Sequence, residues 1–219
     1  MYKCCIFDLD GTLLNTIKAL QKATNLTMER FGLGPLSEEQ IQSIVGDGYK
    51  MQMERALKLC GDKDLIHYEE ALPAYMEIFG KHCMYQVAPY DGILQLLQAI
   101  KERRMKAAVF SNKPHAQTVE NITGIFGSGM FDLVRGHQEG VPKKPDPAGV
   151  YLIMKELGVT SGECLYFGDT GTDMQTGKNA GLDTAGVLWG FRKREELERF
   201  SPKYLIETPQ EAIAFLDRN

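Results

Sequence analysis

Short apolar segments alternate with longer segments of helical period over most of the chain. The apolar segments run on without polar alternation, which is typical of strands in a sheet covered on both faces. They predict strands at Tyr2–Phe7, Lys106–Phe110, Phe131–Val134, Leu165–Phe167, Thr184–Leu188 and Tyr204–Ile206. From about residue 88 onward a helical pattern follows each strand, and this order predicts βαβ units and a parallel sheet.

Helical patterns fill the intervals between these strands. Apolar residues recur between Gly92 and Arg104 at the spacing of one helix face. Pro114 suits the first position of another helix, and Asn112 before it is the candidate N-cap. The further helices in this part of the chain are expected at Pro114–Phe126, Pro147–Leu157, Thr172–Ala180 and Gln210–Leu216.

The segment from Thr16 to Val87 has no strand pattern and reads as helical throughout. Helices are expected there at Ile17–Phe31, Ser37–Val45, Tyr49–Leu59 and Leu65–Tyr85. An all-helical insertion between the first two strands of a sheet is best interpreted as a second domain. We therefore predict a three-layer, Rossmann-like α/β core of residues 1–15 and 88–219, and an inserted four-helix domain of residues 16–87.

Composition narrows the class of protein. The 219 residues include 25 Lys and Arg against 29 Asp and Glu, and the basic residues are scattered, so nothing indicates nucleic-acid binding. No stretch reaches the ~20 apolar residues that span a membrane. The five cysteines are odd in number and form no Cys-x-x-Cys pair, which favours reduced thiols in a cytoplasmic protein.

Polar side chains directly follow the predicted strands, where ligands bind in open α/β sheets. They are Asp8 and Asp10 after the first strand, Ser111 and Asn112 after the second, Lys143 and Lys144 after the third, and Asp169 and Asp173 after the fourth. These acidic, hydroxyl and ammonium groups would converge on one edge of the sheet. Such a group predicts a site for a divalent cation and a phosphate.

Elementary chemistry suggests what this group would do. Carboxylates held close together repel one another unless a cation lies among them, and oxygen ligands suit Mg²⁺. One carboxylate can attack phosphorus and form an aspartyl-phosphate, while a second one nearby protonates the leaving oxygen and later activates water. Ser111 and Lys144 would offer a hydrogen bond and a positive charge to the transferring group.

Four motifs carry a resemblance to a known family. Asp8–Leu13 reads DLDGTL and resembles the DxDGTL signature of the haloacid dehalogenase superfamily. Ser111–Lys113, Lys144–Pro147 and Gly168–Asp173 resemble its remaining motifs, in the family's order. The resemblance covers essentially the whole chain, and the helical insertion is similar to the family's four-helix cap. The core motifs depart from the family only at Asn15, where an aspartate is common.

The resemblance implies roles for the acidic residues. Asp8 would be the nucleophile and a Mg²⁺ ligand. Asp10 would be the general acid and base, and would also bind the metal through its backbone carbonyl. Asp169 would ligate Mg²⁺, and Asp173 would support the ion directly or through water.

The resemblance also implies substrate-binding residues. Phosphate contacts are expected at Thr12, Ser111, Asn112 and Lys144, where Lys144 is preferred to Lys143 because the family's lysine precedes a Pro-x-Pro element. In the cap, Val45–Gly48 followed by Glu54–Leu57 is similar to the phosphoglycolate phosphatase branch. There Gly46, Asp47 and Gly48 would face the substrate, mainly through backbone amides.

The expected function is therefore a Mg²⁺-dependent phosphatase for a small phosphorylated metabolite, with phosphoglycolate as the first substrate to test. The alternatives are a sugar phosphomutase of the β-phosphoglucomutase type, and a nucleotidase or pyrophosphatase. Fold and core motifs do not separate these activities, because specificity lies in the details of the site. We expect no nucleic-acid or membrane partner, and both a monomer and a homodimer remain open.

Overall fold

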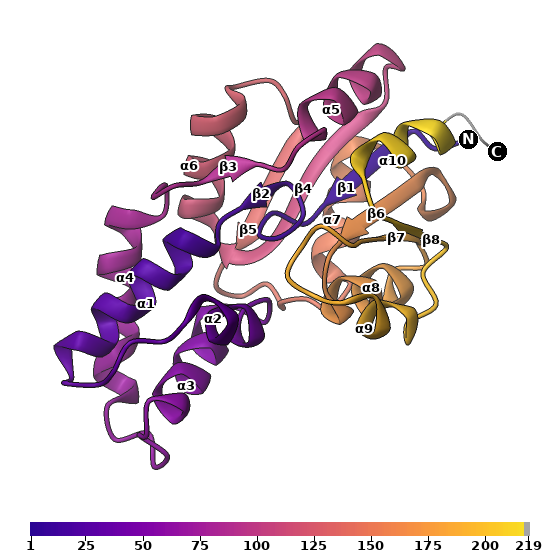
Figure 1. Ribbon diagram of the computed structural model, residues 1–219. Coiled ribbons are helices and arrows are strands. Elements are labelled where there is room, and N and C mark those ends of the chain that lie inside the picture. Colours follow the sequence, from indigo (N-terminus) through magenta and orange to yellow (C-terminus); the bar gives the residue numbers. More distant parts are fainter. Residues whose placement is uncertain (217–219) are drawn as a thin grey trace.

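A computed structural model describes residues 1–216 of the chain; residues 217–219 of the predicted core lie outside the described part (Figure 1). Six strands form one parallel sheet in the order β5-β4-β1-β6-β7-β8. They are β1 (Cys4–Phe7), β4 (Lys106–Pro114), β5 (Leu133–His137), β6 (Cys164–Gly168), β7 (Asp183–Val187) and β8 (Tyr204–Ile206). Every predicted strand is present, so the expected parallel α/β core is confirmed.

Helices cover both faces of this sheet. Because alternate residues of a strand point to opposite faces, Cys5 and Phe7 of β1 join one apolar cluster and Cys4 and Ile6 join another. The first cluster includes side chains of α5 (Ile93–Glu102), α6 (His115–Phe126) and α10 (Pro209–Phe215); the second includes side chains of α7 (Ala148–Leu157). Helix α8 (Gly171–Asn179) follows β6 and packs against β6 and β7. The result is the predicted three-layer arrangement.

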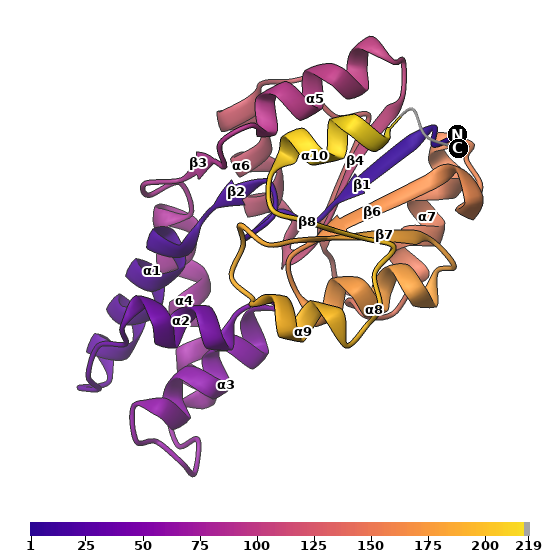
Figure 2. The ribbon, with the colours of Figure 1, turned by 45° about the vertical axis from the view of Figure 1, so that its right-hand side comes forward.

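The inserted segment folds as four helices beside the end of the sheet toward which the strands run (Figure 2). They are α1 (Ile17–Arg30), α2 (Glu38–Ile44), α3 (Tyr49–Leu59) and α4 (Tyr68–His82). These helices share an apolar cluster of their own, in which Met53, Tyr75 and Phe79 are fully buried. The predicted helical cap is therefore present, and it covers the edge where the polar motifs emerge.

Two short strands that the sequence pattern did not predict lie where the chain passes into and out of the cap. β2 (Leu14–Asn15) pairs antiparallel with β3 (Ala88–Pro89). The Asn15 side chain accepts a hydrogen bond from the backbone N–H of Ile17 at 3.3 Å, at the start of α1. The two connections therefore form one paired element, and the domain limits at residues 15/16 and 87/88 stay a prediction. A short helix, α9 (Arg194–Glu198), was also not predicted.

Two further observations bear on the class of protein. Among residues 1–216, no helix is both long and apolar enough to cross a membrane. None of the five cysteines forms a disulfide, and Cys4, Cys5, Cys83 and Cys164 are buried. They pack as small apolar side chains.

The two faces of α5 provide a test of this core. Leu96 is fully buried under the sheet, whereas Leu94 on the same helix keeps 51% of its side chain exposed. We expect Leu96→Ala to lower the free energy of unfolding by about 2–5 kcal/mol, through lost apolar contact and the cavity left behind. Leu94→Ala should change it by less than about 0.5 kcal/mol. Urea unfolding followed by circular dichroism measures both, and equal losses would contradict the assigned buried face.

Candidate active site

Three buried carboxylates meet at the carboxyl ends of β1 and β6, the two central strands of the sheet. Asp8 follows β1, and its backbone N–H still donates to Phe167 O of β6 at 2.9 Å, so the two strand ends stay in register. Asp169 and Asp173 follow β6. One oxygen atom from each of Asp8, Asp169 and Asp173 lies within 4.8 Å of the other two. The structure therefore brings together three of the four acidic residues that the motifs predicted, whereas the Asp10 carboxylate is not in this cluster and lines the cavity described below.

Gly11 allows the two acidic loops to approach so closely. Its φ of +82° lies in the left-handed region, and a Cβ added there would come within 2.3 Å of Asp169 Oδ2. Thr12 holds the same carboxylate, because its hydroxyl donates to Asp169 Oδ1 at 3.3 Å. Thr12 is fully buried and does not line the cavity described below. The structure thus places the Thr12 hydroxyl on Asp169, and a phosphate contact of Thr12 stays a prediction.

Lys144 supplies the positive charge inside this cluster. Its Nζ lies 2.8 Å from Asp8 Oδ1 and 2.6 Å from Asp173 Oδ1, and its side chain is 2% exposed. Burial opposes the charge of this ammonium, but Asp173 and Asp8 outweigh burial and hold its pKa well above the usual lysine value. Asp173 is held in turn by the backbone N–H and hydroxyl of Thr170, at 3.1 Å and 2.6 Å.

One ammonium does not balance three carboxylates in a buried site. Burial and the neighbouring Asp173 raise the pKa of Asp8 to about 7, even though Lys144 opposes the shift. Burial, Asp173 and Asp8 hold the pKa of Asp169 well above its usual range. Asp8 Oδ1 is buried, and the single ammonium beside it, Lys144 Nζ at 2.8 Å, is shared with Asp173. Oxygen ligands with excess negative charge are what a hard divalent cation requires, so the cluster fits such an ion.

Asn112 does not cap α6, contrary to our prediction. β4 continues through Asn112 to Pro114, and Pro114 itself is the N-cap of α6. The Asn112 side chain accepts from the backbone N–H of Lys144 at 2.9 Å and donates to Gly46 O at 3.2 Å. It therefore links the loop that carries Lys144 to the cap, a role that local sequence could not indicate.

The cap segment Gly46–Gly48 lies against the core. Asp47 accepts from the Thr172 hydroxyl at 2.8 Å and pairs with Arg55 at 2.6 Å. Burial opposes this charge, but the Thr172 and Arg55 contacts outweigh it and lower the pKa of Asp47. Gly46 and Gly48 line the cavity, whereas Asp47 does not. The Asp47 carboxylate thus bridges cap and core.

Arg192 joins the core to the cap as well, and the sequence analysis missed it. Its guanidinium donates to Val45 O at 2.7 Å and also to Gln42 O, carbonyls near the end of α2. Arg192 lies in the loop after β7, so only the fold places it there. Next to it, the backbone N–H of Phe191 donates to Asp169 Oδ2 at 2.8 Å. This loop therefore contacts the cap and the acidic cluster together.

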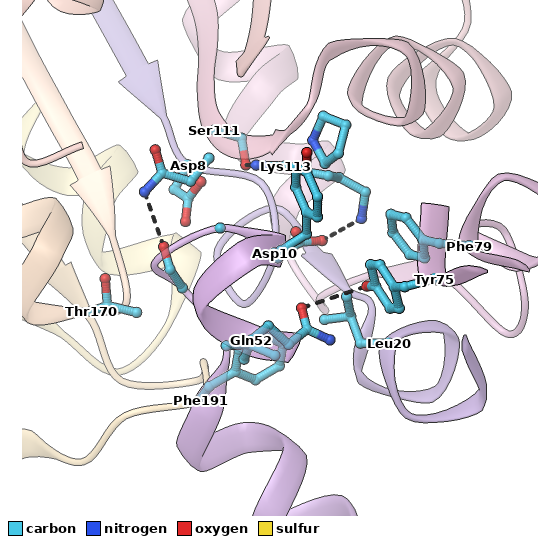
Figure 3. A pocket seen from close by; sticks show the side chains of 16 residues that line it. Asp8, Asp10, Leu20, Gln52, Tyr75, Phe79, Ser111, Lys113, Thr170 and Phe191 are labelled. Carbon is cyan, nitrogen blue, oxygen red and sulfur yellow. Dashed lines mark hydrogen bonds and ion pairs between the residues drawn. The ribbon is translucent and has the colours of Figure 1, made fainter. Parts of the chain in front are cut away.

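A cavity that is partly open to solvent lies between cap and core (Figure 3). From the core, the side chains of Asp8, Asp10, Ser111 and Lys113 line it, and Lys113 Nζ pairs with Asp10 Oδ1 at 2.8 Å. From the cap, the wall is mainly apolar and aromatic, formed by Leu20, Val45, Tyr49, Tyr75 and Phe79 together with Gln52. The cavity therefore has a charged floor and an apolar roof.

The site combines charged strand ends and a buried lysine with a helical cap. This combination is typical of capped α/β enzymes that transfer a phosphoryl group. The chain belongs to the haloacid dehalogenase-like hydrolases, whose family model matches residues 5–187. It is 30% identical to a phosphoglycolate phosphatase of Aquifex aeolicus, over 98% of this chain and 96% of that protein.

Other relatives carry other substrate names. The chain is 30% identical to an N-acetylmuramic acid 6-phosphate phosphatase of Pseudomonas aeruginosa, over 99% of this chain and 95% of that protein, and relatives in Listeria at 29% identity are named pyrophosphatase. A crystal structure of a provisionally named phosphoglycolate phosphatase from Lactobacillus delbrueckii subsp. bulgaricus has a TM-score of 0.91 and 29% identity, covering 99% of each chain. The protein is therefore an enzyme, a phosphatase.

The close approach at Gly11 provides a test of the site. Gly11→Ala should push Asp169 away and lower phosphatase activity by at least about 100-fold, because displacements near 1 Å have such effects. Gly32→Ala is the matched control: its φ of +67° is also left-handed, but an added Cβ meets no atom within 4 Å. Phosphate release and thermal unfolding are measured for both. Equal activity in the two variants would show that crowding at Asp169 is unimportant.

Proposed function

We propose that this phosphatase hydrolyses a small phosphorylated metabolite through an aspartyl-phosphate on Asp8. The observation that carries the proposal is the setting of Asp8. It is buried, its Oδ1 atom lies 2.8 Å from Lys144 Nζ, and it lines the same cavity as Asp10. A nucleophile and an acid that follow the same strand thus face one cavity.

Asp8 and Asp10 have different roles in the proposed reaction. An Asp8 oxygen forms a bond to phosphorus as the bond from phosphorus to the ester oxygen breaks, and Asp10 gives its proton to that leaving oxygen. Asp10 then removes a proton from water, which attacks phosphorus and releases phosphate and the Asp8 carboxylate. Ser111 and Lys144 would hold the phosphoryl oxygens, where charge develops during the transfer.

The same carboxylates support a Mg²⁺ site. Asp8, Asp169 and the backbone carbonyl of Asp10 would hold the ion, and Asp173 would support it from the side of Lys144. When bound, Mg²⁺ supplies Lewis-acid stabilisation of a phosphoryl oxygen and offsets the repulsion among the carboxylates. The excess negative charge of the buried cluster is the reason to expect the ion.

The cap completes the site in this proposal. Gly46 and Gly48 are the cap residues that would face the substrate, and Asn112 ties Gly46 to the Lys144 loop. Closure of the cap over the site would exclude bulk water while the aspartyl-phosphate forms. Phosphoglycolate is the first candidate substrate, on the cap motif and on relatives with that name.

The proposal is tested by phosphate release from a panel of substrates. Phosphoglycolate, pyrophosphate, N-acetylmuramic acid 6-phosphate, a nucleoside monophosphate and p-nitrophenyl phosphate are offered with Mg²⁺ or with EDTA. We expect release that EDTA abolishes, and that Asp8→Asn lowers to background. Asp64→Asn, at an exposed aspartate, is the control and should keep full activity. EDTA-resistant release, or an active Asp8→Asn variant, would contradict the mechanism.

Asp10→Asn separates the two steps. It should lower steady-state turnover by about 10²- to 10⁴-fold, because it removes both the acid and the base. With p-nitrophenyl phosphate, whose leaving group needs no proton, the first step continues. We then expect a burst of about one p-nitrophenol per enzyme in rapid-mixing kinetics. A linear time course at the reduced rate would show that Asp10 is not the base of the second step.

A further inference from the structure

We propose that Lys113 determines which substrates are accepted, by binding an anionic group on the leaving part of the substrate. The inference rests on the proposed function and specifies its substrate class. Lys113 is distinct from Lys144, the lysine of the acidic cluster. Its Nζ lies 2.8 Å from Asp10 Oδ1 and 5.0 Å from the centre of the Phe79 ring (Figure 3).

The charges of the cavity single out this lysine. Among the described residues that line it, Lys113 is the only cation, against the carboxylates of Asp8 and Asp10. The cations around the cavity are engaged elsewhere. Lys144 contacts Asp8 and Asp173, Lys143 donates to Asp47 O, Arg55 pairs with Asp47, and Arg192 donates to the cap carbonyls. Lys113 is therefore the cation of the described lining that can balance an anion entering beside the phosphoryl group.

The position of Lys113 next to Asp10 adds a second argument. Asp10 has to lie next to the leaving oxygen in order to protonate it. Lys113 is paired with Asp10, so its ammonium lies beside that oxygen on the leaving-group side. An anion attached one or two bonds beyond the ester oxygen would meet it there. The carboxylate of a phosphorylated 2-hydroxy acid and the second phosphate of pyrophosphate both meet this description.

The surroundings strengthen the interaction. The Lys113 side chain is 1% exposed, and Phe79 and Tyr75 form an apolar wall close to it. An ammonium has three donors, and the described residues take one of them through Asp10. Hydrogen bonds from charged donors gain strength where water is excluded. A substrate with a neutral leaving group would leave these donors without a partner, and this asymmetry is what gives selectivity.

Lys113 could instead serve only to hold Asp10 in place, and the two roles predict different kinetics. A positioning residue affects turnover of every substrate to the same extent. A residue that binds the leaving group affects those substrates that carry the anion, chiefly through KM. A matched pair of substrates therefore separates the roles: phosphoglycolate, and 2-hydroxyethyl phosphate, in which a neutral CH₂OH replaces the carboxylate.

The experiment compares kcat and KM for this pair in wild type, Lys113→Met and Lys113→Arg, with Mg²⁺ present. We expect wild type to prefer phosphoglycolate. In Lys113→Met, kcat/KM for phosphoglycolate should fall about 10- to 100-fold further than kcat/KM for 2-hydroxyethyl phosphate. Lys113→Arg should recover part of that preference because it restores the charge. Lys81→Met, at an exposed lysine of α4, is the control and should keep the wild-type preference.

Three outcomes would overturn the inference. Equal losses for both substrates in Lys113→Met, in a variant that thermal unfolding shows to be folded, would reduce Lys113 to a positioning residue. A wild-type enzyme that prefers 2-hydroxyethyl phosphate to both phosphoglycolate and pyrophosphate would show that the cavity does not select anions. Absence of Mg²⁺-dependent release from every substrate, p-nitrophenyl phosphate included, would overturn the proposed function itself, and the inference with it.

Discussion

Three carboxylates, those of Asp8, Asp169 and Asp173, repel one another in a buried site. The single ammonium among them is that of Lys144, which lies 2.8 Å from Asp8 and 2.6 Å from Asp173. Low local dielectric strengthens both the repulsion and the ion pairs, so small displacements of these groups carry large energies. The surrounding structure accordingly holds the acidic residues in place. Thr12 and the Phe191 backbone hold Asp169, and Thr170 holds Asp173 at the start of α8. Burial first and the charge of Asp173 second raise the pKa of Asp8, and a bound cation would offset this charge.

The cap is joined to this cluster through residues of the core. Asn112 contacts both the Lys144 backbone and Gly46 O, and Arg192 reaches the end of α2 from the loop that also holds Asp169. Thr172, one residue before Asp173, donates to Asp47 of the cap. Each of these three contacts begins at or beside a residue that positions a charged group. Cap placement and site geometry are therefore coupled, as the proposed mechanism requires of a site that excludes water.

The proposed mechanism gives the cavity a phosphoryl end and a leaving-group end. This division accounts for relatives of one family that carry different substrate names. In the proposed mechanism, the phosphoryl group binds at the strand ends beside Lys144. In the same proposal, the leaving group lies against Lys113 and the cap wall around Tyr75 and Phe79, residues outside the acidic cluster, where a substitution would change charge or shape. Specificity can therefore vary while the reaction stays the same.

The sequence by itself determined the parallel α/β core, the helical cap and the two acidic strand ends. Continuous apolar strands and the polar residues that follow them are local patterns, and parallel strands bring such residues to one edge. Tertiary structure alone decided the pairing of β2 with β3, the bridge from Asn112 to the cap, the contacts of Thr12 and Arg192, and the ion pair of Lys113 with Asp10. These contacts join residues far apart in the chain. Hydrophobic periodicity carries no information on such pairs, because it reports only which face of an element is buried.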